Sequence, residues 1–272
     1  MKLDLDGIQA DSLVGMLKAS YTLENWEGIV LIADKLYSEI NNIYETNEGR
    51  HAPVENHNVL GLNRSIVYYF GYSMCLKGIA LRKQGNNSES RACIKKYAEL
   101  GWINAIHEED LQEVEYYKSI AKANTYVIDL LEGKIVVLDE YIDFLRNNKD
   151  EMLPGLIHVL ESSIKYNYSV DSILAEFQGV IDSMSEYYKT KRNIRYYNDY
   201  IYLLGKYYSK RENKADALNT VLNALTSSVN LKDDIGFKKA VALFEVLREY
   251  ATLIQLEQYK NIMITIIEKN GS

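Results

Sequence analysis

The stretch from Tyr197 to Thr226 constrains the fold of this chain more than any other. It reads YNDYIYLLGKYYSKRENKADALNTVLNALT, two amphipathic segments joined by a short polar turn. Gly205 in the first segment and Ala217 in the second are small enough to let two helix backbones approach, and Ala224 leaves room for a further helix. The stretch therefore predicts a tightly packed antiparallel helical hairpin.

The same stretch resembles one tetratricopeptide repeat. The repeat's order of L-G, Y, A, a large apolar residue and A is matched by Leu204, Gly205, Tyr208, Ala217, Val221 and Ala224. Tyr208 is expected to fill the gap beside the small residues. Ile201 stands where the repeat has an early Trp, and the closing Pro is missing. Asn213 should cap the second helix, with Asp216 near the positive end of the helix dipole.

Helical spacing of apolar residues continues through the rest of the chain. It predicts helices over 8–22 and 25–47, 59–84 and 86–101, 107–132 and 134–147, 151–166 and 169–188, the hairpin starting near 191, and 234–250 and 253–269. Only two prolines interrupt the chain, and strand-like alternation never lasts beyond a few residues. We therefore expect an all-α, right-handed superhelix of about six tetratricopeptide-like pairs, a single domain over 1–272 with a loop insertion at 47–58.

Packing inside these helices can be predicted at a few positions. Trp26 should pack against the preceding helix. Gly78 is expected to face a second helix whose packing positions are Ser90, Ile94 and Tyr97, with the run 86–89 as its cap.

Charge and composition exclude several classes of protein. Hydrophobic residues make up 47% of the chain, which excludes global disorder, and the net charge of −7 with a pI near 5.3 weighs against a nucleic-acid module. Cys75 and Cys93 form no CxxC motif and are expected to be reduced, buried thiols. The N-terminus lacks the features of a signal peptide and no segment is apolar enough to span a membrane, so we expect a cytoplasmic protein without membrane partners.

No catalytic signature was found in the sequence, and the interpretation is non-enzymatic, with no cofactor and no metal. The four histidines are His51, His57, His107 and His158. The first two share a polar loop, but their six-residue spacing without a nearby Cys is a weak metal signal. His158 is expected to be a packed residue rather than a catalytic base.

Candidate binding residues follow from the repeat pattern, in which the first helix of each pair lines the concave surface. Counting from the two glycines gives Tyr72, Ile79, Arg82 and Lys83, and Asp199, Tyr202, Lys206 and Ser209. Asn124 is added because an amide can donate to and accept from one peptide unit, although it could equally satisfy a neighbouring helix end. The 23 tyrosines, against five phenylalanines, suit either inter-helix packing or a groove wall.

A basic cluster interleaves with tyrosines between residues 189 and 211. Its members are Lys189, Lys191, Arg192, Arg195, Lys206, Lys210 and Arg211. Such a mixture can hold an acidic peptide or a nucleic acid. A solvated face at helix ends is the favoured explanation.

Three segments carry a resemblance to a family. YYFGYSMCLKGIALRKQGNNSESRACIKKYAELGW (68–102), AKANTYVIDLLEGK (121–134) and LPGLIHVLESSIKYN (153–167) resemble the C-terminal repeat region of Bacillus-type helix-turn-helix regulators. More loosely, they resemble the peptide-responsive regulators of Gram-positive quorum sensing. The resemblance implies transcription regulation and a short peptide bound on the concave face. An N-terminal helix-turn-helix is not found here, so the DNA-binding domain was either removed or never present.

The leading prediction is a sensor or interaction module that binds a peptide or protein segment in its concave groove, with a homodimer as a further option. DNA would be reached only through a missing helix-turn-helix domain or a partner. The alternatives are a structural protein–protein adaptor, and a regulator that contacts DNA through the basic cluster at 189–211.

Overall fold

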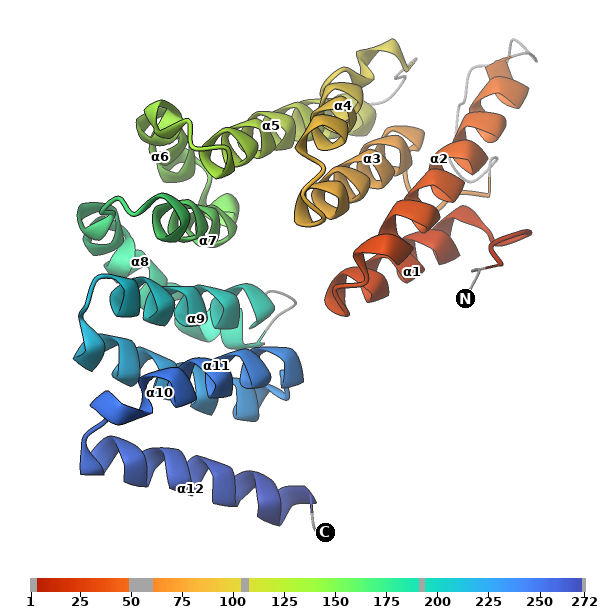
Figure 1. The fold of residues 1–272 in the computed structure, drawn as a ribbon. Coiled ribbons are helices and arrows are strands. Elements are labelled where there is room, and N and C mark those ends of the chain that lie inside the picture. Colours follow the sequence, from red (N-terminus) through yellow and green to blue (C-terminus); the bar gives the residue numbers. More distant parts are fainter. Residues whose placement is uncertain (1–3, 49–60, 104–107, 191–193, 271–272) are drawn as a thin grey trace. The chain divides into compact units, whose positions relative to one another are not determined.

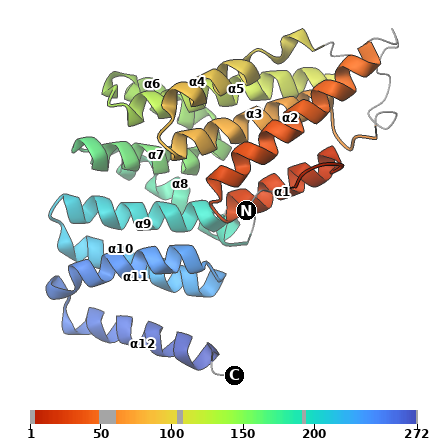
Figure 2. The same cartoon turned by 45° about the vertical axis from the view of Figure 1, so that its right-hand side comes forward.

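The computed structural model describes residues 4–48, 61–103, 108–190 and 194–270, and in this part all regular structure is helical (Figures 1 and 2). The all-α prediction is thereby confirmed. The α-helices are α1 Ala10–Thr22, α2 Trp26–Glu48, α3 Ile66–Lys83, α4 Asn87–Ala98, α5 Glu108–Leu131, α6 Leu138–Asn147, α7 Lys149–Tyr166, α8 Asp171–Thr190, α9 Ile194–Lys210, α10 Lys214–Leu231, α11 Asp234–Leu247 and α12 Leu253–Asn270. Three short 3-10 helices are η2 Leu100–Trp102, η3 Ile135–Val137 and η4 Arg248–Tyr250.

The chain divides into two compact units, residues 1–128 and 129–272, whose boundary falls inside α5. Each unit contains closely packed helical hairpins of its own. The superhelix of about six pairs and the single domain stay predictions.

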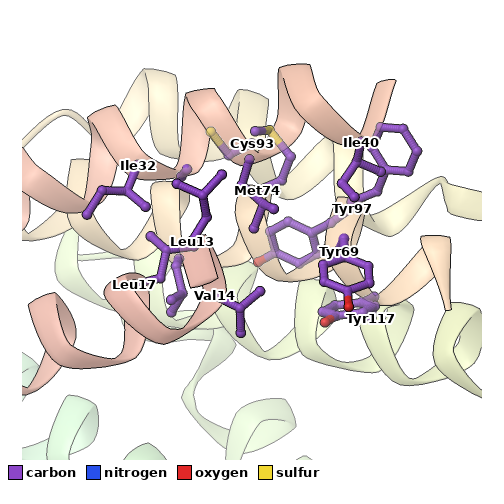
Figure 3. Close-up of a cluster of buried hydrophobic side chains, with 14 of the residues drawn as sticks. Leu13, Val14, Leu17, Ile32, Ile40, Tyr69, Met74, Cys93, Tyr97 and Tyr117 are labelled. Carbon is purple, nitrogen blue, oxygen red and sulfur yellow. The ribbon is translucent and has the colours of Figure 1, made fainter. Parts of the chain in front are cut away.

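The first unit has its core between α1, α2 and α3 (Figure 3). Leu13 and Leu17 of α1 and Ile32 of α2 are almost fully buried there. The rings of Tyr21 and Trp26 meet edge to face with centroids 5.7 Å apart. Because Tyr21 belongs to α1, the prediction that Trp26 packs against the preceding helix is confirmed.

Helix α3 starts later than the spacing of apolar residues predicts. The sequence predicts a start at residue 59, but residues 59–60 lie outside the described part. Gly61 has a left-handed backbone with φ of +66°. Ser65 is the N-cap, and its side chain accepts a hydrogen bond from the Tyr68 amide at 3.1 Å. Leu62 is buried in the turn that precedes the helix.

Helices α3 and α4 form a close hairpin, as predicted. A Cβ atom added to Gly78 would lie 3.2 Å from the Cβ of Cys93, so only glycine fits without displacement. Ser90 donates a hydrogen bond from Oγ to the Gly78 carbonyl at 2.7 Å. The expected cap differs, because the Asn86 side chain makes no capping hydrogen bond. The chain reverses direction between α3 and α4 at Gly85, whose φ is +85°.

In the second unit, α9 and α10 form the hairpin that the sequence pattern predicts. Ala217 and Ala224 are almost fully buried, and a Cβ added to Gly205 would lie 3.0 Å from Cγ2 of Val221. Asn213 caps α10, with Oδ1 accepting from the Asp216 amide at 3.3 Å, as predicted. Figure 1 shows α11 and then α12 continuing this layered arrangement within the unit.

Tyr208 is half-buried, so its role as the filler of the gap beside the small residues stays a prediction. Its neighbour Tyr207 is 1% exposed and faces another helix. The Tyr207 hydroxyl donates to Oδ1 of Asp171 at 2.7 Å and accepts from the Val170 amide at 3.1 Å. Tyr207 thus ties α9 to the start of α8.

None of the helices in the described ranges is long and apolar enough to cross a lipid bilayer. Cys75 and Cys93 are free thiols. Cys93 is buried, as predicted, whereas Cys75 is only half-buried.

Candidate functional site

The predicted groove residues fall into two sets, one in each unit. Tyr72, Arg82, Lys83 and Asn124 belong to the first unit, and Asp199, Tyr202 and Lys206 to the second. Each set is therefore a candidate surface of its own.

In the first unit, Arg82 and Asn124 are brought together in a crevice between α3, α4 and α5. Asn124 donates from Nδ2 to the Tyr97 hydroxyl at 2.9 Å, and the space around them leaves no room for a water molecule. Burial raises the pKa of Tyr97 well above its ordinary value, so the hydroxyl stays protonated. The Asn124 amide thus binds a side chain of the neighbouring helix α4. This contact is close to the alternative in which Asn124 satisfies a neighbouring helix end.

The other two residues of this set lie apart from the crevice. Tyr72 is half-buried and stacks on Tyr68 with ring centroids 5.3 Å apart, and the Lys18 ammonium lies 5.8 Å from the Tyr72 ring. Lys83 is exposed at the end of α3.

In the second unit, Asp199, Tyr202 and Lys206 share one face of α9, because residues three and four apart are neighbours on a helix surface. Tyr202 is half-buried and Lys206 is exposed. Oδ1 of Asp199 pairs with Nζ of Lys239 on α11 at 3.3 Å. The set therefore forms a polar face with both signs of charge that continues from α9 onto α11; we call it the α9 polar face.

A groove of about 450 Å³ opens on the other side of α9, between α8 and α10. Tyr197, Tyr200, Ile201 and Leu204 supply the α9 part of its lining. Polar side chains dominate the wall from α10: Thr220, Asn223, Thr226, Ser227 and Asn230. We call this the α8–α10 groove.

Sequence reasoning missed the α8–α10 groove. The available signal was the recurrence of small polar residues at helical spacing along α10, at 220, 223, 227 and 230. Such a row is also typical of an ordinary solvated helix face, so only the neighbouring helices distinguish the two.

Titratable groups in the described part form no metal site. There is no cluster of three or more His, Cys, Asp and Glu side chains among these residues that could hold a metal ion. His158 is half-buried, and its Nδ1 lies 2.8 Å from Oε2 of Glu161 on the next turn. His51, His57 and His107 lie outside the described residues.

Much of the predicted basic cluster is also outside the described part, because the side chains at 189, 191, 192 and 195 fall there. Of the remaining members, Lys210 donates from Nζ to the Ile164 carbonyl at 2.7 Å, and Lys206 and Arg211 are exposed. The loop insertion likewise lies beyond the described residues from position 49 on.

Comparison of the chain with protein-family models, with curated proteins and with solved structures found no match. The resemblance to helix-turn-helix regulators therefore stays a prediction.

Proposed function

We propose that this protein is a non-enzymatic helical-repeat module that binds a peptide or protein segment along the α9 polar face. The observation that carries the proposal is the joining of Asp199, Tyr202 and Lys206 on one face, extended to α11 by the Asp199–Lys239 ion pair. In a stack of hairpins the first helices of successive pairs line one surface, and α9 and α11 are two such helices.

The chemistry of this face suits an extended segment rather than a small apolar molecule. Lys206 offers an exposed ammonium group to a carboxylate, and the Asp199–Lys239 pair offers an acceptor and a donor side by side. Tyr202 adds ring area at a low cost in side-chain entropy. Arg82 and Asn124 line the sealed crevice in the first unit and are not needed for binding a segment on the α9 polar face.

Regulation of transcription is the proposed use of such binding. A bound segment would stabilise one rotation between neighbouring hairpins over another, and a DNA-binding domain or partner would respond to that change. This step depends on the resemblance of segments 68–102, 121–134 and 153–167 to regulator repeat regions.

Affinity selection with a defined library tests the binding proposal. The full chain is immobilised and offered a synthetic library of seven-residue peptides with free termini, and retained peptides are identified by mass spectrometry. The double variant Tyr202→Ala/Lys206→Ala should retain at least tenfold less of the selected peptides. The matched control is Tyr116→Ala/Lys118→Ala, which alters an exposed tyrosine and an exposed lysine of α5 that belong neither to the α9 polar face nor to the α8–α10 groove. Equal retention by wild type and the Tyr202→Ala/Lys206→Ala variant would refute the assignment.

A second candidate function, a protein–protein adaptor, is favoured by the surface of α12. Leu253, Ile254 and Ile267 are 84%, 73% and 71% exposed, and Ile264 is 39% exposed. Exposed apolar residues gathered on one helix are typical of protein contact surfaces. Sedimentation velocity tests whether the contact is between copies: the wild type should self-associate and Leu253→Ser/Ile267→Ser should not. A wild type that stays monomeric at high concentration argues against the homodimer.

A further inference from the structure

We infer that the α8–α10 groove is a second binding site, separate from the α9 polar face, and that it takes an uncharged, extended peptide segment of about four or five residues. The inference goes beyond the proposed function, because it concerns another surface and a ligand without charged groups.

Helix geometry separates the two surfaces. Successive residues of an α-helix are turned by about 100° around its axis. On that basis the groove-lining Tyr197, Tyr200, Ile201 and Leu204 point about 180° away from Asp199, Tyr202 and Lys206. A segment bound in the groove would therefore contact different α9 side chains from a segment on the α9 polar face.

Tyr200 points to a ligand in this groove. Its side chain lines the groove and is 3% exposed, and its hydroxyl has no hydrogen-bond partner among the described residues. A buried hydroxyl without a partner costs free energy that the fold does not regain by itself. Burial raises the pKa of Tyr200, so the group remains a donor at neutral pH. The hydroxyl is closed to water in this arrangement, so a ligand carbonyl becomes its acceptor once the side chains that cover the hydroxyl move aside.

The α10 wall matches the repeat of an extended peptide. Asn223 and Asn230 are both exposed groove residues, and at 1.5 Å per residue they stand about 10.5 Å apart along α10. An extended chain covers this distance in about three residues. Each side-chain amide both donates and accepts, which is what one peptide unit requires. Two such amides therefore hold two peptide units in register.

The opposite wall and the floor restrict the ligand further. Gln178 of α8 donates from Nε2 to Oδ1 of Asp182 at 2.7 Å, which orients its amide. Asp182 is the one charged side chain among the lining residues that the structure describes. These described residues therefore offer no cationic partner to a phosphate or a carboxylate. Ile201 and Leu204 offer an apolar floor for small apolar side chains.

A hydrogen-bonded chain holds the α10 wall in place. Ser227 donates from Oγ to Oδ1 of Asn198 at 2.6 Å, and Asn198 donates from Nδ2 to Oδ2 of Asp233 at 2.9 Å. Asn198 is 2% exposed. The chain links α10 to α9 and to the cap of α11, so the groove is built on helices that are fixed to one another.

The test is an affinity selection on the immobilised full chain with a library of N-acetylated, C-amidated pentapeptides that contain no Asp, Glu, Lys or Arg. Wild type should retain a subset of this library. Asn223→Ala/Asn230→Ala should lower the retention at least tenfold, and Tyr200→Phe about three- to tenfold, which corresponds to one lost hydrogen bond. Tyr202→Ala/Lys206→Ala is the matched control and should retain the same subset as wild type.

A thermal melt without peptide separates lost binding from lost folding. Because Tyr200→Phe removes an unpartnered buried hydroxyl, its Tm should equal or exceed that of wild type. The inference would be overturned if Tyr200→Phe and wild type retain the library equally, or if wild type retains no blocked peptide. Maltotriose is offered separately as an uncharged ligand that is not a peptide, and retention of maltotriose instead of peptides would also overturn the inference. If Tyr202→Ala/Lys206→Ala lowers the retention of the peptides with free termini but not of the blocked pentapeptides, the proposed function stands whether or not the groove binds peptides.

Discussion

The hairpins α3–α4 and α9–α10 share a plan but differ in how they treat a buried tyrosine. Each has a glycine on its first helix that faces the second, Gly78 against Cys93 and Gly205 against Val221. Beside the first hairpin, the Tyr97 hydroxyl is satisfied by Asn124 from α5 and the crevice is sealed. Beside the second, Tyr200 lacks a partner among the described residues and a groove stays open. The same backbone contact therefore supports either a closed interior or a binding surface, depending on the third helix.

The two units agree in another use of tyrosine. Tyr69 of α3 donates to Oδ1 of Asp11 on α1 and accepts from the Asn63 amide at 3.2 Å. Tyr207 of α9 makes the same two kinds of contact with Asp171 and the Val170 amide. Burial, and then the Asp11 hydrogen bond, raise the pKa of Tyr69. These tyrosines fasten helices together, which is the packing role considered for the abundant tyrosines.

The largest expected effect tests whether both hairpins depend on their glycines. Gly78→Val and Gly205→Val place branched side chains where an added Cβ already meets a neighbour at 3.2 and 3.0 Å. Each should lower the free energy of unfolding by about 3 kcal/mol, the upper end for overpacking. Urea denaturation measures this by circular dichroism and by tryptophan fluorescence, which reports the first unit because Trp26 and Trp102 both lie there.

Matched controls come from glycines with open surroundings. An added Cβ meets nothing within 4 Å at Gly15 of α1 or at Gly179 of α8. Gly15→Val and Gly179→Val should change the free energy of unfolding by less than about 0.5 kcal/mol. Equal losses in the controls and the hairpin variants would show that the close crossings do not matter for stability.

A smaller effect sharpens the contrast between the sealed crevice and the open groove. Asn124→Ala leaves the Tyr97 hydroxyl, which is 1% exposed, without its donor, and should cost about 2 kcal/mol. Asn124→Ala/Tyr97→Phe removes both partners and should recover at least half of that loss. The measurement is urea denaturation followed by tryptophan fluorescence. A double variant no more stable than Asn124→Ala would argue against the hydrogen bond as the cause.

The smallest effect concerns the Tyr207–Asp171 contact and its dependence on pH. Hydrogen bonds from Ser169 and then Tyr207 lower the pKa of Asp171 below its usual value. The contact therefore stabilises the folded chain above the unfolded pKa of about 3.9, and the stabilisation is lost as the pH falls through the folded pKa. Because Asp171 is exposed, the pH-dependent part should be at most about 1 kcal/mol.

Tyr207→Phe is the variant that measures it. The difference in free energy of unfolding between wild type and Tyr207→Phe should be larger at pH 7 than at a pH well below the lowered folded pKa of Asp171, where Asp171 is protonated in both proteins. Asp171→Asn should show little of this pH dependence. A wild type–Tyr207→Phe difference that is the same at both pH values would show that the Val170 amide, and not the carboxylate, accounts for the contact.

Local pattern predicted most of the helices correctly, and the errors have local causes. The start of α3 was placed too early, because Gly61 has a left-handed backbone and Ser65 is the residue that caps the helix. Asn86 does stand at the N-cap position of α4, but its side chain makes no capping hydrogen bond. The Asn213 cap was predicted correctly, because its side chain accepts from an amide only three residues away. Such a contact is set by the local backbone and not by other helices.

The candidate binding residues were predicted less completely. Asp199, Tyr202 and Lys206 do share a face, since that follows from helical spacing within α9. Lys239, which pairs with Asp199, was not predicted, because it lies on a different helix forty residues further along the chain. The sealed state of the Arg82–Asn124 crevice could not be predicted either, because three helices contribute to it.

The sequence by itself determined that this protein is helical, where most of its helices lie and that Gly78 and Gly205 sit at helix crossings. These properties depend on residues within one or two turns of each other, so spacing along the chain reveals them. The tertiary structure decided which tyrosine hydroxyls find partners and on which side of α9 a groove opens. Each of these outcomes requires side chains from helices that are distant in sequence, and their distances exist only once the helices have packed.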